Sequence, residues 1–157
     1  MWSAVFSAEP VSVASRISLP APLRAVLLGA LDVRDRRHHS ATSMAETLRV
    51  AMRQVAAKLR DAARVADTVC RIGGEEFLVI CRQADNDAAQ QCGERLRRAI
   101  ARDPIAVGDA AQTITISVGV ATTLEGGVRD AQSLLECADR ALYAAKREGR
   151  DRVAIAA

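Results

Sequence analysis

Two adjacent glycines followed at once by two glutamates, Gly73-Gly74-Glu75-Glu76, are the residues of this chain with the clearest capacity for chemistry. The segments on either side predict two short strands, so the glycines would form the turn of a hairpin. Glycine accepts the positive φ angles of a tight turn, and its missing Cβ lets a ligand approach the backbone. Surface glutamates after such a turn are nevertheless more often solvent-facing than catalytic, so the rest of the chain must decide.

Composition limits the classes of protein to which the chain can belong. Its 157 residues, half of them apolar, fit one soluble domain with a real core. The net charge of +3 comes without a dense basic block, which argues against a nucleic-acid groove or a membrane-binding face. No apolar run is long enough to span a bilayer. Four cysteines without Cys-x-x-Cys spacing indicate buried, reduced thiols in a cytoplasmic protein.

Hydrophobic periodicity predicts alternating strands and helices after a loosely ordered leader over residues 1–20. The expected strands are 23–33, 68–71, 76–81, 113–121 and 152–155, and the expected helices are about 44–63, 87–101 and 130–149. The order βαββαβ followed by αβ predicts an α+β fold of ferredoxin-like kind. In such a fold, helices pack mostly on one face of a twisted, mixed sheet.

The run Gly73-Gly74-Glu75-Glu76-Phe77 resembles the signature of the GGDEF family, the diguanylate cyclases, with Glu in place of Asp. Two further motifs match those of the family: Ile114-Thr115-Ile116-Ser117-Val118-Gly119-Val120 and, with x for any residue, Ala138-Asp139-x-Ala141-Leu142-Tyr143-x-Ala145-Lys146-x-x-Gly149-Arg150. The resemblance covers about residues 22–155 and implies a nucleotidyl-cyclase-like domain over residues 21–157. It also implies condensation of two GTP into cyclic di-GMP and pyrophosphate by a homodimer, since neither half alone can close the ring.

The resemblance implies a metal site at the mouth of the first strand. Asp32 and Glu75, with the Val33 carbonyl, would hold Mg²⁺ or Mn²⁺, and Glu76 would add metal ligation or help accept the hydroxyl proton. Attack of a ribose 3′-hydroxyl on an α-phosphate requires a cation held by few carboxylates, with phosphates and water as its other ligands. Without the resemblance, Asp32 is an acid at a strand end, which is more often solvated than metal-bound.

Lys146 and Arg150 are one helical turn apart, so both can project toward triphosphate oxygens, as the family uses them. Cations at a helix C-terminus are also favoured by the helix dipole without any ligand. Gly73 and Gly74 would leave room for the nucleotide beside the hairpin backbone. These four residues, together with Ser40, form the substrate site that the resemblance implies.

The base-reading positions depart from the family pattern. The Asn and Asp that read guanine in the family fall on Ser40 and Arg49, and the second acid expected after the first strand is Arg34. Ser40 keeps one weak hydrogen bond. An arginine presents donors to the N1 and N2 donors of guanine, a loss of about 1–3 kcal/mol. We therefore expect weaker recognition of guanine.

Arg64-x-x-Asp67, five residues before the glycines, has the form of the family's inhibitory site for cyclic di-GMP, and Arg95 falls where a second arginine joins it. An arginine fork pairs with guanine O6 and N7, and a carboxylate accepts from N1 and N2. Where Arg-x-x-Asp occurs by chance, it is more often a surface ion pair that contributes little to stability. Two interpretations stay open: a diguanylate cyclase with product inhibition, or a catalytically weak or inactive domain that acts as a cyclic di-GMP receptor or dimerisation module.

Overall fold

The computed structural model describes residues 25–33, 41–82, 84–107, 110–123 and 130–156. The predicted leader over residues 1–20 lies outside these ranges, and so do Arg34 and Ser40. Within them, a five-stranded mixed sheet is flanked by three helices, which confirms the predicted α+β class.

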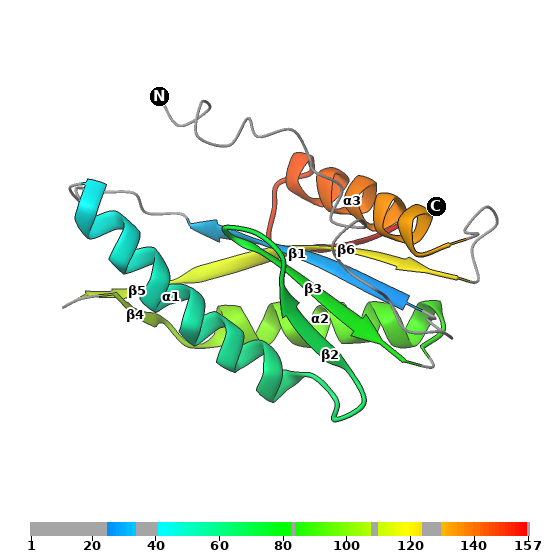
Figure 1. Cartoon of the computed structure of the whole chain (residues 1–157), viewed down its shortest axis with the longest axis horizontal. Coiled ribbons are helices and arrows are strands. Elements are labelled where there is room, and N and C mark those ends of the chain that lie inside the picture. The colour runs from blue at the N-terminus through cyan, green and yellow to red at the C-terminus, as the bar shows by residue number, and fades with distance from the viewer. Residues whose placement is uncertain (1–24, 34–40, 83, 108–109, 124–129, 157) are drawn as a thin grey trace.

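The strands of the main sheet follow the order β2-β3-β1-β6-β7 (Figure 1). Their bounds are β1 Ala25–Val33, β2 Thr68–Arg71, β3 Glu76–Cys81, β6 Ile114–Thr122 and β7 Val153–Ile155. β1 lies at the centre and pairs antiparallel with both β3 and β6, whereas β6 and β7 are parallel. β1 and β6 are buried along almost their whole described length, as expected for strands covered on both faces.

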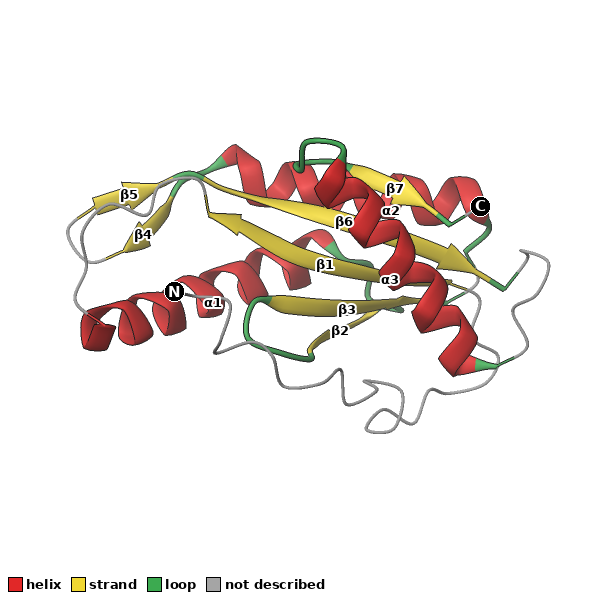
Figure 2. Ribbon diagram, turned by 90° about the horizontal axis from the view of Figure 1, so that it is seen from above, coloured by secondary structure: helices red, strands yellow, loops and turns green. Residues whose placement is uncertain are grey.

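Helices cover both faces of the sheet (Figures 1 and 2). They are α1 Ala41–Ala62, α2 Asn86–Arg102 and α3 Ala131–Arg147. Alternate residues of β1 divide between two cores: Leu27 and Leu31 belong to the core under α1 and α2, and Val26 and Leu28 to the core under α3. Two of the three helices thus share one face, as the sequence predicted. None of the described helices has the length and apolar character that crossing a bilayer requires.

Side-chain caps fix where α2 and α3 begin. The Asp85 carboxylate accepts from the backbone N–H of Ala88 at 2.8 Å. Asp130 caps α3, as the sequence predicted: its carboxylate accepts from the backbone N–H of Ser133 at 2.8 Å, and its own N–H donates to the Ser133 hydroxyl. These hydrogen bonds lower the pKa of Asp130.

α3 lies directly on the backbone of β6 at Gly119. A Cβ placed on Gly119 would sit 2.1 Å from the Ala138 carbonyl oxygen and 2.3 Å from the Leu142 backbone nitrogen. Both distances are far below any contact that real atoms tolerate, and backbone atoms cannot rotate away. The helix therefore approaches the strand more closely than any side chain at this position would allow.

A small hairpin was missed from the sequence. It consists of β4 (Ile105–Val107) and β5 (Ala110–Gln112), which pair antiparallel beside α1 (Figure 1). Gln54 of α1 holds it, because its amide donates to the Ala106 carbonyl at 2.6 Å and accepts from the Ala106 N–H at 3.2 Å. Three-residue strands are too short to show a period in sequence, and this pair depends on a contact 52 residues away.

Candidate active site

The end of β1 and the Gly-Gly hairpin lie side by side. The backbone N–H of Leu31 donates to the Glu75 carbonyl at 3.2 Å, and Ala30 lies opposite Glu76 in the β1–β3 register. Asp32, at the end of β1, is thus adjacent to the two hairpin acids. The backbones that carry these three acids thus lie side by side at one end of the sheet.

The hairpin turn is held by Arg71 at the end of β2. Its Nε donates to the Gly73 carbonyl at 3.3 Å, and its Nη2 donates to the Gly74 carbonyl at 2.8 Å. The N–H of Ile72 also donates to the Glu76 carbonyl at 3.1 Å. These contacts fix the backbone of the turn, while the Glu75 side chain stays exposed and Glu76 is half-buried.

The strand register shows on which face of the sheet Asp32 and Glu76 lie. On β3, Phe77 belongs to the core under α1 and α2, so Glu76 belongs to the α3 face. Asp32 lies on that same face, because its neighbour Leu31 belongs to the opposite core. Asp32 and Glu76 therefore share a face at the same end of the sheet, and Glu75 stands at the turn itself.

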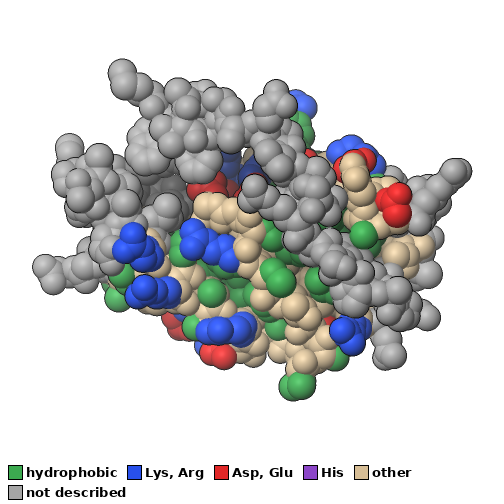
Figure 3. All heavy atoms as spheres, in the orientation of Figure 1, with side chains coloured by type: hydrophobic (Ala, Val, Ile, Leu, Met, Phe, Trp, Pro, Cys, Tyr) green, Lys and Arg blue, Asp and Glu red, His purple; other side chains and the backbone are tan. Residues whose placement is uncertain are grey.

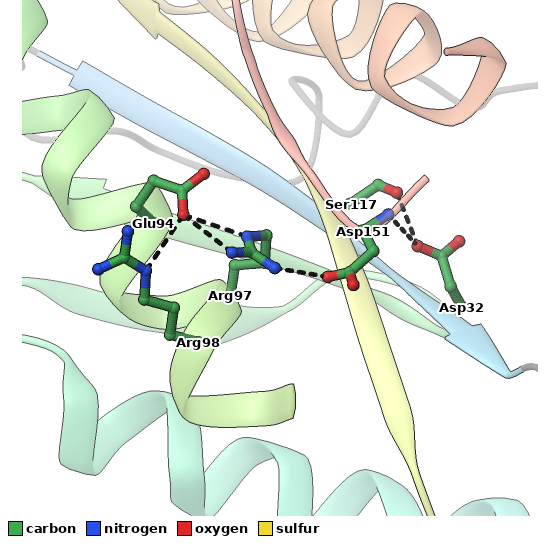
Figure 4. A network of polar contacts seen from close by, with 6 residues as sticks. All are labelled: Asp32, Glu94, Arg97, Arg98, Ser117 and Asp151. Atoms are coloured by element: carbon green, nitrogen blue, oxygen red, sulfur yellow. Dashed lines mark hydrogen bonds and ion pairs between the residues drawn. The ribbon is translucent and has the colours of Figure 1, made fainter. Parts of the chain in front are cut away.

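Asp32 is buried, with 8% of the residue exposed, and it is held by three donors, of which Figure 4 shows Ser117 and Asp151. The Ser117 hydroxyl of β6 donates to its Oδ2 at 2.6 Å, and the Asp151 backbone N–H approaches the same oxygen at 3.5 Å. The Arg150 guanidinium Nε lies 3.4 Å from its Oδ1. A buried carboxylate needs such partners, and they fix its orientation.

Thr115 adds an unusual feature beside this acid. It lies directly opposite Asp32 in the β1–β6 register, so the two side chains share a face. Its hydroxyl oxygen is buried and has no hydrogen-bond partner among the described residues. Buried polar atoms are seldom left unpaired, and an unpaired one indicates a place where a water or ligand belongs.

The turn after α3 brings Arg150 and Asp151 to Asp32. Gly149, Arg150 and Asp151 have φ angles of 115°, 64° and 47°, and the Arg150 N–H donates back to the Ala145 carbonyl at 3.0 Å. This is a helix end of the Schellman type continued by two left-handed non-glycine residues. Each left-handed residue costs about 1–2 kcal/mol, so surrounding contacts must hold the turn.

One such contact comes from α2. Arg97 Nη1 donates to Asp151 Oδ1 at 2.8 Å, and Arg97 also pairs with Glu94 at 3.1 Å (Figure 4). The hydrogen bond to Asp151 is the main reason why the pKa of Arg97 is raised, and this contact stabilises the charged guanidinium. A chain of contacts therefore runs from Glu94 through Arg97 and Asp151 to Asp32.

A second cluster lies where α1 ends and α2 passes. The Asp67 carboxylate accepts from the Arg64 backbone N–H at 3.0 Å, and the Arg64 side chain is exposed. Arg95 Nε donates to the Ala62 carbonyl at 2.7 Å, and Arg95 Nη2 lies 3.4 Å from the Cys92 sulfur. The Asp67 carboxylate is within 4.8 Å of that same sulfur. The structure thus gathers Arg64, Asp67 and Arg95.

Beside this cluster, the outer face of α2 forms an open groove of about 740 Å³. Its lining is rich in arginine: Arg95, Arg98 and Arg102. α1 adds the exposed Arg49 and Arg53, and Figure 3 shows Lys and Arg side chains gathered over this helix. Such a surface favours anionic ligands without selecting among bases.

Cys81 and Cys92 are in contact, a pairing that their spacing in the sequence did not indicate. The two sulfurs lie 3.4 Å apart, and both residues are almost fully buried. The hydrogen bond between them raises the pKa of Cys81, which donates, and lowers the pKa of Cys92, which accepts. Arg95 lowers the pKa of Cys92 further.

Comparison with known proteins tests the resemblance seen in the motifs. The family model described as "Diguanylate cyclase, GGDEF domain" matches residues 50–152, about two thirds of the chain. This chain belongs to the GGDEF family. The match includes the hairpin acids, Arg64, Asp67 and Arg95, and the end of α3, whereas β1 with Asp32 lies outside it.

Two curated relatives have the same family character. Over 102 residues the GGDEF domain is 43% identical to diguanylate cyclase DgcP of Pseudomonas aeruginosa, which covers 65% of this chain and 15% of the relative. Over 106 residues it is 35% identical to diguanylate cyclase A of Treponema denticola, covering 68% of this chain and 28% of the relative. The chain thus spans a small part of the length of these relatives.

The fold agrees with solved GGDEF domains. The GGDEF domain of DgcB from Caulobacter crescentus, solved in complex with c-di-GMP, is 27% identical, with a TM-score of 0.64 over 85% of this chain and 78% of that chain. This likeness confirms the predicted nucleotidyl-cyclase-like sheet.

The structure places the predicted site residues unevenly. Val33 ends β1, Lys146 lies half-buried in the last turn of α3, and Arg150, predicted to face a triphosphate, is paired with Asp32. Ser40 lies outside the described residues. Ser117 was missed as a partner of Asp32, although a serine between the apolar Ile116 and Val118 was a signal for it. Nothing in the sequence indicated Arg97.

Proposed function

We propose that this GGDEF domain condenses two GTP into cyclic di-GMP and pyrophosphate. The observation that carries the proposal is that buried Asp32, paired with Arg150, ends the strand that lies beside the hairpin of Glu75 and Glu76. Membership of the GGDEF family and the names of its relatives support the same activity.

A divalent cation would fit the donor set at this end of the sheet. Asp32, Glu75 and the Val33 carbonyl offer hard oxygen atoms from adjacent segments, which is the ligand type that Mg²⁺ and Mn²⁺ prefer. The unpaired Thr115 hydroxyl next to Asp32 supports a missing polar occupant. When bound, such a cation polarises the α-phosphate and neutralises charge that develops during attack.

The protein groups around the acids would position the reactants. Glu76, on the same face as Asp32, would add metal ligation or help accept the proton of the attacking 3′-hydroxyl. Arg150 would exchange its pairing with Asp32 for the triphosphate, since its side chain is 61% exposed and an exposed ion pair is weak. Lys146, in the last turn of α3, would bind the same phosphates. Gly73 and Gly74 leave space for the nucleotide.

A homodimer is part of the proposal, because two GTP molecules must react with each other twice to close a ring. Each copy would present one nucleotide at its own Asp32 and hairpin, with the two 3′-hydroxyls facing opposite α-phosphates. GTP as substrate and free thiols at all four cysteines suit the cytoplasm, where we propose that the domain acts.

Product inhibition would use the cluster at Arg64, Asp67 and Arg95. Arg64 is exposed and free to stack on or pair with guanine, while Arg95 and Asp67 lie next to each other around Cys92. The solved c-di-GMP complex of a related GGDEF domain supports a site of this ligand class in the fold.

A second function, that of a cyclic di-GMP receptor or dimerisation module without turnover, is favoured by one observation. Arg49, at the position where the family reads guanine with an acid, is exposed on α1 and offers donors where acceptors are needed. Such a domain would keep the Arg64 cluster and lose productive GTP binding.

Incubation of the purified chain with GTP and Mg²⁺, followed by chromatography of the nucleotides, tests the proposal. We expect a cyclic di-GMP peak that disappears in Glu75→Gln and persists in Glu136→Gln, an exposed glutamate early in α3. Absence of product together with calorimetric binding of cyclic di-GMP would replace the enzyme by the receptor.

A further inference from the structure

Cys81 and Cys92 lie close enough that a small movement would allow a disulfide bond between them. Cys81 ends β3, Cys92 lies in the second turn of α2, and their sulfurs are 3.4 Å apart. A disulfide needs an S–S distance of about 2.05 Å, so the sulfurs must approach by only about 1.4 Å. Small side-chain rotations at a strand end and on a helix can supply that movement.

The surroundings make the two sulfurs chemically unequal. Cys81 donates its S–H to Cys92, and the guanidinium Nη2 of Arg95 lies 3.4 Å from the Cys92 sulfur. A neighbouring cation and a donated hydrogen bond both stabilise a thiolate, and the pKa of Cys92 is lowered for these reasons. Cys92 is therefore the nucleophile, with Cys81 placed to attack it afterwards.

A metal site is the competing explanation for this cluster. Asp67, Cys81 and Cys92 offer ligand atoms that all lie within 4.8 Å of one another. Zinc accepts such ligands, but an arginine at 3.4 Å from one sulfur places a permanent positive charge where the cation would have to bind. The position of Arg95 favours a thiolate and a disulfide over a metal.

We propose that Cys81 and Cys92 form an oxidisable dithiol that closes to a disulfide in the presence of a peroxide, and that this closure changes ligand binding at Arg95. Hydrogen peroxide is the oxidant because it is little larger than water and both thiols are buried. Arg95 lines the groove beside α2 and also contacts the Cys92 sulfur, so one side chain joins the groove to the cluster.

The reaction balances in two steps. The Cys92 thiolate attacks one peroxide oxygen, the O–O bond breaks, and the departing hydroxide takes the proton of Cys81 to become water. The Cys81 thiolate then attacks the sulfur of the Cys92 sulfenic acid, the S–S bond forms, and hydroxide leaves and is protonated by solvent. Two thiols are oxidised to one disulfide, and one peroxide is reduced to two waters.

Oxidation removes the charge on the sulfur next to Arg95. Its effect on ligand binding rests on the proposed cyclic di-GMP site. In the reduced protein, one guanidinium nitrogen is occupied by the Cys92 sulfur, while Nε is fixed to the Ala62 carbonyl. A disulfide sulfur carries no charge and is a poor acceptor. Oxidation thus frees a donor for guanine, and we expect binding of cyclic di-GMP to tighten about three- to tenfold.

The first experiment asks whether the bond forms. The double variant Cys70→Ser/Cys137→Ser leaves Cys81 and Cys92 as its cysteines. The variant is treated with hydrogen peroxide, denatured and alkylated, and its mass is then measured by mass spectrometry. We expect a loss of about 2 Da, no alkylation and reversal by dithiothreitol. Cys81→Ser should instead leave a Cys92 sulfenic acid that dimedone traps. Two alkylated thiols after peroxide, or zinc retained through dialysis that blocks alkylation, would overturn the dithiol.

The second experiment asks whether the bond matters. Cyclic di-GMP is titrated by calorimetry into the reduced and the oxidised double variant. Cys92→Ser, which cannot form the disulfide, is the control. Equal affinities in both redox states would overturn the coupling to Arg95. If the disulfide forms but the nucleotide binds in neither state, the coupling again fails, the proposed inhibitory site fails with it, and the dithiol stands alone.

Discussion

The guanidinium of Arg97 and the carboxylate of Asp151 form an ion pair of 2.8 Å that joins a helix on one face of the sheet to the turn that follows the helix on the other face. Both side chains are mostly buried, with exposed fractions of 21% and 27%. Because Asp151 also presents its backbone N–H to Asp32, the pair connects α2 to the candidate metal acid.

Arg97→Ala should therefore lower both stability and cyclase activity. Leaving Asp151 without its partner costs about 1–3 kcal/mol of unfolding free energy, and it loosens the left-handed turn that carries Arg150. Urea denaturation and initial rates measure the two effects. Arg98→Ala is the control, since Arg98 is 75% exposed and pairs with Glu94 at 3.5 Å. Equal losses in both variants would show that Arg97 has no special role.

Glu75→Ala should abolish product formation and leave the thermal unfolding temperature unchanged. Its side chain is exposed at the hairpin tip, so it contributes little to the core, yet its loss would remove a proposed metal ligand. Chromatographic assay of cyclic di-GMP and a thermal melt of the same sample check this. A variant that makes product at the original rate would exclude the metal site at this position.

Discrimination between GTP and ATP should be poorer than is usual for an enzyme that reads guanine. Arg49 stands where guanine donors need an acceptor, and an arginine cannot accept a hydrogen bond. Competition of ATP against labelled GTP for binding gives the ratio. If GTP wins by several orders of magnitude, another acceptor reads the base, and the alignment of Ser40 and Arg49 with the base-reading positions is wrong.

Arg64→Ala should weaken cyclic di-GMP binding by about 1–3 kcal/mol and leave GTP binding nearly unchanged, because a bidentate guanine contact is lost away from the hairpin. In an active enzyme, the variant should also escape product inhibition. Arg60→Ala, an exposed arginine in the last turn of α1, is the matched control. Calorimetric titration with each nucleotide measures both affinities, and equal losses for the two ligands would mean that Arg64 supports the fold.

The cap of α3 should make stability depend on acid pH. The pKa of Asp130 is lowered in the folded protein because the carboxylate accepts hydrogen bonds from Ser133. Its contribution is therefore present above the ordinary aspartate pKa of about 4 and is lost as pH falls through the lower folded-state pKa. Thermal melts between about pH 2 and pH 6 should show a smaller acid dependence for Asp130→Asn, which keeps a capping oxygen. Identical slopes would contradict this.

Local signals in the sequence predicted most of the fold. β2 and β3 have the predicted bounds, because the Gly73-Gly74 turn and the apolar run after it define both strands. Asp130 as the cap of α3 was predicted for a similar reason: capping depends on residues three positions apart. The leader over residues 1–20 and the division into domains stay predictions.

Contacts between distant segments were not predictable. Ser117 meets Asp32 across 85 residues, and Arg97 meets Asp151 across 54. Neither pair has a spacing rule, since the partners come together only when the sheet and helices have packed. Arg150 was expected to face phosphate, and its pairing with Asp32 at 3.4 Å is a further contact between distant segments.

The absence of a side chain at Gly119 determines how closely α3 packs on the sheet. It thereby determines the positions of Lys146 and Arg150. Lys146 lies about one turn beyond Leu142, which lies on the Gly119 backbone, and Arg150 lies in the left-handed turn after the helix. Any residue with a Cβ at position 119 would push α3 away from the sheet and shift both cations with it. The positions of two cations thus depend on a hydrogen atom in the middle of a strand, and a single added methyl group there would shift them without changing any polar residue.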